Sequence, residues 1–179
     1  MSDYTHSVIK LFPFGVRETR VAVGTTNLPW GAVESAEASE TLITADLKGD
    51  DTIAAQHSLI EKITGTLKLG GVSLQAYALV TGRIVATTGV TPTRGSTLSL
   101  TAGDAFPYFR LYIRAVTDDG GDVWYVIYKA KISEGAKGTF AYGAFRETDI
   151  SFVGVADSAN SNKFMDIITH ETASALPTT

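Results

Sequence analysis

FRLYIRAVTDDGGDVWYVIYKAKI, residues 109–132, contains the clearest structural pattern in this chain. Apolar and polar side chains alternate from Phe109 to Ala115, which is the period of a β-strand with one buried face. The Asp-Asp-Gly-Gly run that follows is typical of a tight turn, and the aromatic and β-branched residues 123–132 return as a second strand. The stretch therefore predicts an antiparallel β-hairpin.

Further strand patterns lie on both sides of this hairpin. A second, longer hairpin is predicted from residues 41–47 and 52–69, which flank the turn sequence Lys48-Gly49-Asp50-Asp51. Additional strands are expected at residues 17–25, 98–101, 138–145, 148–155 and 163–170. The small-residue stretch around Glu34, Glu37 and Glu40 is compatible with a helical turn or a mobile loop.

Only one segment has a helical pattern. Apolar residues share one helical face between a double glycine and a single glycine: Val72, Ala76, Leu79 and Val80, after Gly70-Gly71 and before Gly82. Other apolar residues occupy the opposite side, so this helix is expected to be largely buried.

The 179 residues have a length that suits one domain, and no internal repeat or linker divides them. We expect an all-β domain, residues 1–179, with one short α-helix. The predicted architecture is an antiparallel β-sandwich or half-barrel with a long hairpin loop. An extended N-terminal arm (residues 1–16) and a frayed C-terminal tail (residues 171–179) complete it.

Composition narrows the classes of function. The net charge is −4, and the 15 Lys and Arg residues are scattered, so no basic cluster marks a site for nucleic-acid phosphates. The absence of cysteine excludes disulfides, thiolate metal sites and cysteine nucleophiles. No apolar run approaches the roughly 20 residues that cross a bilayer, and the first residues do not resemble a signal peptide. We expect a protein that folds in the cytosol without membrane insertion.

No residue pattern predicts an active site, so the chain is expected to be neither an enzyme nor a metal or cofactor protein. His6, His57 and His170 have no metal-ligand spacing. The Asp-rich turns lack a calcium-loop pattern, and neither GxxxxGK[ST] nor GxSxG occurs. The aromatic residues between positions 108 and 128 fit core and interface packing better than a stacking platform for bases or sugars.

Three segments in order resemble the major tail proteins, or tail tube proteins, of long-tailed bacteriophages. They are LKGDDTIAAQHSLIEKITGTLKLGGVSLQAYALVTG (47–82), DDGGDVWYVIYKAKIS (118–133) and GTFAYGAFRETDISFVGVADSANSNKFMDIITHETA (138–173). The specificity lies in their combined order rather than in any single motif. The resemblance implies a β-sandwich or half-barrel of the tail-tube type, with a helix packed against it.

The same resemblance implies a structural role in a virion that is assembled in the cytoplasm of a host bacterium. Subunits of this family typically close into hexameric rings, which stack into a hollow tail tube around a tape-measure protein. Double-stranded DNA leaves through the bore without specific binding. The implied partners are other copies of the chain, the tape-measure protein, the tail terminator and the baseplate or tip proteins.

Two sets of residues are candidates for these roles. The hairpin tip, formed by Lys48, Gly49, Asp50 and Asp51, is expected to reach a neighbouring subunit in the adjacent ring. The electrostatic potential of the bore is expected to be neutral or negative, so that DNA passes without binding to the wall. The candidate bore residues are Glu61, Glu147, Asp149 and Ser151. Lys62 and Lys68 fit this assignment only if they pair with carboxylates across a subunit boundary.

Two other functions remain open. The first is a soluble β-sandwich binding module for carbohydrate or protein, with Trp30 or Trp124 as a stacking platform. The second is the inner tube of a related contractile tail or secretion machine.

Overall fold

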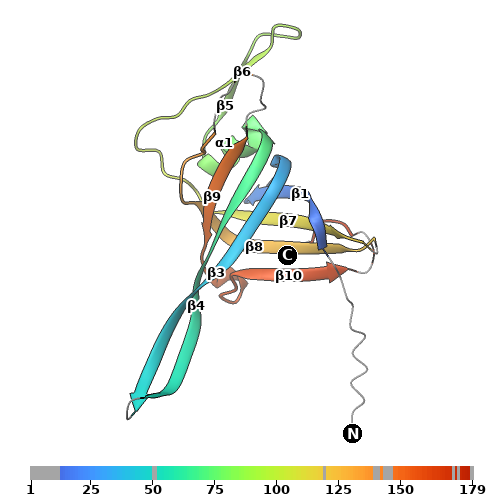
Figure 1. The fold of residues 1–179 in the computed structure, drawn as a ribbon. Helices are drawn as coiled ribbons and strands as arrows, with labels where there is room; N and C mark the ends of the chain where they lie inside the picture. The colour runs from blue at the N-terminus through green and yellow to red at the C-terminus, as the bar shows by residue number, and fades with distance from the viewer. Residues whose placement is uncertain are drawn as a thin grey trace.

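The computed structural model describes residues 13–49, 52–118, 120–138, 142, 147–170, 172 and 174–177, and they form a mostly antiparallel β protein (Figure 1). The elements are β1 (Pro13–Val23), β2 (Thr26–Pro29), β3 (Gly31–Gly49), β4 (Thr52–Val72), α1 (Leu74–Thr81), β5 (Val85–Thr88), β6 (Gly95–Leu98), β7 (Phe109–Thr117), β8 (Asp122–Ile132), β9 (Thr148–Gly154), a 3-10 helix (Ser158–Asn160) and β10 (Met165–His170). This confirms the predicted all-β class with one short α-helix. Most of the predicted N-terminal arm lies outside the described residues.

Among these strands, one sheet has the order β2-β1-β7-β8-β9-β4-β3, and β10 also pairs with β8. Strand β8 is a branch point, because β10 pairs with residues 122–127 and β9 pairs with residues 130–132. As a result, β7, β8 and β10 run across the direction of β3, β4 and β9 (Figure 1). The sheet is compatible with the expected sandwich or half-barrel, and β5 and β6 form a separate pair.

The main core lies where β1, β4, β7, β8 and β9 face helix α1. The alternation predicted for β7 is confirmed, since Phe109, Leu111, Ile113 and Ala115 are all buried. Trp30, which is fully buried, meets the Phe109 ring edge-on with 5.7 Å between the ring centroids. Such edge-to-face aromatic packing stabilises the core beyond simple area burial.

Helix α1 begins and ends close to the predicted glycines. Ser73 caps its N-terminus by accepting a hydrogen bond from the Ala76 amide at 3.4 Å. At the C-terminus, Gly82 is left-handed with φ of 70°, and the amides of Gly82 and Arg83 donate to the carbonyls of Leu79 and Ala78. This is a Schellman motif, which requires a residue that tolerates positive φ.

Two local predictions are wrong. The segment containing Glu34, Glu37 and Glu40 is neither a helical turn nor a loop but part of β3, because β4 pairs with it along its whole length. The strand expected at residues 98–101 lies earlier, as β6, where it pairs with β5. Cross-strand partners, rather than local propensity, determine both outcomes. Most of the strand expected at residues 138–145 lies outside the described residues.

Candidate assembly surfaces

The predicted long hairpin is confirmed, and its far end leaves the body of the protein. Strand β4 pairs with β9 only from Ile63 to Leu69. Nearer the tip, in the described part of the chain, β4 pairs with β3 alone. We call residues 41–49 and 52–62 the distal ribbon. At about 3.3 Å per residue, it extends about 30 Å from the body (Figure 1).

One face of the distal ribbon is almost wholly apolar. Residues directly opposite each other on antiparallel strands point to the same side, so the register defines this face. Its paired members are Ile43 and Leu59, Ala45 and His57, and Leu47 and Ala55. We call these six residues the apolar stripe. The large members are well exposed: Ile43 by 55%, Leu47 by 66% and Leu59 by 58%.

The opposite face of the ribbon is more polar. Leu42 pairs with Ile60 near the body, whereas hydrophilic pairs follow toward the tip: Thr44 with Ser58, and Asp46 with Gln56. The Thr44 and Ser58 hydroxyls are 3.3 Å apart. The ribbon is therefore amphipathic, although no part of the described body covers its apolar face.

The predicted tip lies at the end of this ribbon. Lys48 and Gly49 end β3, where they pair with Ile53 and Thr52, and Asp50 and Asp51 lie outside the described residues. Contact between the tip and a neighbour therefore stays a prediction. The apolar stripe was not predicted. Its residues are visible in the sequence, but the register decides which of them share a face.

Three of the four candidate bore residues lie together on the outer face of β4 and β9. Asp149 is opposite Lys68 in the register, and Ser151 is opposite Thr66. Glu147 reaches the same face, because its carboxylate contacts Lys68. An open hollow of about 670 Å³ lies beside them and is lined partly by polar residues: Glu37, Ser39, Thr64, Thr66, Ser133 and Ser151.

Lys68 is paired within its own chain. Its Nζ lies 2.7 Å from Glu147 and 3.4 Å from Glu34, so it needs no carboxylate from across a subunit boundary. The hydrogen bond to Glu147 raises the pKa of Lys68 above its ordinary value. Lys62 makes no ion pair with the described residues. Glu61 is exposed and lies apart from the other three candidates, at a register shift where the ribbon leaves the body.

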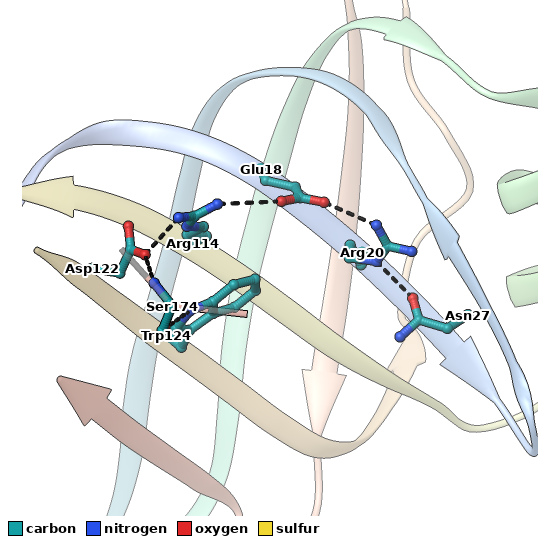
Figure 2. Close-up of polar contacts among 7 residues, drawn as sticks. All are labelled: Glu18, Arg20, Asn27, Arg114, Asp122, Trp124 and Ser174. Atoms are coloured by element: carbon teal, nitrogen blue, oxygen red, sulfur yellow. Dashed lines mark hydrogen bonds and ion pairs between the residues drawn. The ribbon is translucent and has the colours of Figure 1, made fainter. Parts of the chain in front are cut away.

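A polar network crosses β1, β7 and β8 and ends at the C-terminal segment (Figure 2). Arg20 contacts Glu18 at 3.0 Å, and Glu18 lies 3.8 Å from Arg114. The Arg114 guanidinium meets the Asp122 carboxylate at 2.5 Å. Since Asp122 is only 1% exposed, this is a buried ion pair. The Arg114 contact lowers the pKa of Asp122, and burial partly opposes that shift.

This network also holds the C-terminal segment over Trp124. The Ser174 amide donates to Asp122 at 2.6 Å, and the Trp124 indole donates to the Ser174 hydroxyl at 3.1 Å (Figure 2). Leu176 packs against the buried cluster formed by Tyr112, Trp124, Val126 and Tyr128. Residues 174–177, predicted as a frayed tail, are therefore part of the fold.

The tryptophans that a stacking platform would need are not accessible. Trp30 is fully buried and Trp124 is 1% exposed. Tyr112 and Tyr128 are buried as well, whereas Tyr108 is 47% exposed and lies under Lys129 and Lys131. The well-exposed ring of Tyr108 is thus already in contact with two lysines.

The two described histidines lie on different elements. His57 lies on the distal ribbon and His170 ends β10, while His6 lies outside the described part. No group of three or more His, Cys, Asp or Glu residues converges there as a metal site. Within the same residues, no helix is long and apolar enough to span a membrane.

The sequence matches no known protein-family profile and is not significantly similar to any curated protein. The surfaces described above are therefore the basis for inferring what the chain does.

Proposed function

We propose that this chain is a structural subunit that assembles with copies of itself into a hollow tube. The proposed tube is of the kind formed by tail tube proteins of long-tailed bacteriophages: stacked, hexameric rings around a tape-measure protein, through which DNA is ejected. The resemblance of the three sequence segments and the β architecture both support this proposal.

The observation that carries the proposal is the exposed apolar stripe of the distal ribbon. An isolated two-stranded ribbon is marginally stable in water, and three or more strands or packing against another element are normally needed. Here Ile43, Leu47 and Leu59 are each more than half exposed. Contiguous apolar surface of this kind marks a site of contact with another molecule. A second copy that covers the stripe would stabilise the ribbon and connect two subunits.

The outer face of β3, β4 and β9 has the chemistry that a DNA conduit needs. Hydroxyl and carboxylate groups predominate there, and Lys68 is neutralised by Glu147 and Glu34. Unpaired cations would bind phosphates and slow the passage of DNA. Scattered carboxylates repel DNA only within about 10 Å at physiological salt, which is enough to keep it off a wall. We therefore assign Glu147, Asp149 and Ser151 to the bore.

Self-assembly is tested by sedimentation velocity and negative-stain electron microscopy over a range of protein concentrations. We expect rings or tubes as the concentration rises. Deleting residues 49–52 should abolish tubes while leaving the circular dichroism spectrum native. Deleting residues 91–94 shortens the β5–β6 turn by the same length and should leave tubes intact.

Each part of the proposal has an outcome that would contradict it. A strictly monomeric protein at millimolar concentration would contradict self-assembly and favour the binding module. Tubes of normal length after deletion of residues 49–52 would contradict the role of the hairpin tip. A tube structure whose bore is lined by unpaired Lys and Arg side chains would contradict the conduit.

A further inference from the structure

A second apolar surface lies at the junction of β4, α1 and β6. It is a groove of about 500 Å³ lined by Gly71, Val72, Leu74, Tyr77, Leu98, Leu100, Ala136 and Thr148. Leu100 is 66% exposed and Leu74 is 38% exposed, so the groove opens to solvent. No lining residue carries a charge.

Two charged residues close to the groove in the sequence are already paired. Lys137, next to the lining residue Ala136, contacts Glu134 at 2.5 Å. Asp104, in the loop after Leu100, contacts Arg83 at 2.9 Å. The groove therefore favours an uncharged, apolar occupant over a charged one.

The groove and the apolar stripe lie at opposite ends of the same strand. Gly71 and Val72 end β4, whereas Ala55, a member of the stripe, lies near its start. Figure 1 shows α1 and β6 at one end of the molecule and the distal ribbon at the other. At about 3.3 Å per residue, β4 separates them by roughly 50 Å, so a chain cannot place its stripe in its own groove.

We propose that the groove receives the apolar stripe of a second copy of this chain. The inference rests on the self-assembly proposed above and identifies the surface that accepts the hairpin. Both surfaces are exposed and contain no Lys, Arg, Asp or Glu, and the stripe is apolar apart from the imidazole of His57. Joining them removes aliphatic side chains on both copies from water, and this favours association.

The contact is directional. Stripe and groove are different surfaces, so each added copy leaves one free stripe at one end and one free groove at the other. Heterologous contacts of this type extend without closing unless a rotation brings the ends together. Because the two surfaces lie at opposite ends of the molecule, growth proceeds along its long direction, which would be the tube axis.

One stripe in one groove is a small contact. Six side chains cover much less than the roughly 800 Å² per partner of a stable complex. A single contact is therefore weak. In a ring, several subunits form the same contact at once, so each contact raises the effective concentration of the others and strengthens the binding between rings. Covalent trapping is accordingly the appropriate test.

Because the native chain contains no cysteine, only the introduced cysteines can react with a thiol-specific cross-linker. The variant with both Leu47→Cys and Leu100→Cys, treated with a short bis-maleimide, should give a ladder of dimers, trimers and longer chains on a denaturing gel. A 1:1 mixture of the two single variants should stop at the heterodimer, because each carries one reactive surface. Leu47→Cys combined with Val90→Cys is the matched control, since Val90 is 77% exposed but outside the groove.

We expect at least tenfold more cross-linked oligomer from the variant with Leu47→Cys and Leu100→Cys than from the control with Leu47→Cys and Val90→Cys. Equal ladders, or chains longer than a dimer from the mixed single variants, would overturn the assignment of the groove. Rings or tubes of wild-type protein together with no ladder would overturn this inference and leave the proposed function standing. A ladder together with no rings or tubes at any concentration would overturn the proposed function and leave the contact between stripe and groove standing.

Discussion

Replacing Asp122 with Asn removes the charge from the buried end of the network in Figure 2 and nearly preserves the shape of the side chain. The amide oxygen can still accept from the Ser174 amide, so the change tests mainly the ion pair with Arg114. Removing one partner of a buried ion pair costs about 3–5 kcal/mol. Arg114 keeps its 3.8 Å contact with Glu18 and its position over the Trp124 ring, so we expect the lower end, about 3 kcal/mol.

Urea denaturation followed by tryptophan fluorescence measures this loss, because Trp30 and Trp124 are both buried in the folded protein. Asp104→Asn is the matched control. It removes the same charge from an ion pair with Arg83 in which Asp104 is one-third exposed, so it should lower the free energy of unfolding much less than Asp122→Asn does.

The stability difference should also depend on pH. Because the Asp122 pKa is lowered from 3.8 in the folded state, its ionised form contributes stability above about pH 4. That contribution is lost as the pH falls through the lowered value. The gap between wild type and Asp122→Asn should thus be full at pH 7 and narrow in acid. Equal losses for the two variants, or a gap independent of pH, would refute the assignment of a stabilising buried charge.

Three further predictions concern stability. Gly65→Ala places a methyl group against the backbone carbonyl oxygen of Glu37 and 2.5 Å from the Phe152 ring, so it should lower the free energy of unfolding by about 1–3 kcal/mol. Gly70→Ala has open space around it and should leave the free energy of unfolding unchanged; thermal denaturation measures both variants. Burial and a hydrogen bond to the Asp166 carboxylate raise the pKa of Tyr128 to about 12. The free energy of unfolding of wild type should therefore fall between about pH 10 and 12, and this fall should be absent in Tyr128→Phe when both are denatured over an alkaline pH series. Lys68→Met, at an exposed ion pair, should leave the urea midpoint nearly unchanged; a clear fall in the midpoint would mean that the pair is stronger than its exposure implies.

Local sequence patterns predicted the elements whose determinants are close together in the chain. The alternation in β7, the turn before β8 and the glycines around α1 all lie within one element or its ends. The long hairpin was also predictable, because its turn sequence separates two strand-like segments. In each case, short-range chemistry and burial agree.

Elements that depend on distant partners were harder to predict. The first half of β3 has three glutamates among small residues, and it becomes a strand because β4 pairs with it. The ion pairs of Lys68 join Glu34 and Glu147, which come from opposite sides of it in the chain. The groove draws on β4, α1, β6 and the residues before β9. No local pattern specifies such convergence, so the candidate site was predicted only in part.

Strand β4 runs from the distal ribbon through the sheet to α1 without interruption, and this has a mechanical consequence. Hydrogen bonds between antiparallel strands lie perpendicular to the strand direction. A pull along β4 loads its pairs with β3 and β9 in shear, so many bonds must break together. A pull across the strands would instead open them one at a time. If copies join end to end as proposed, stretching the assembly pulls each subunit along its most resistant direction, and the small contacts between copies would part before any strand does.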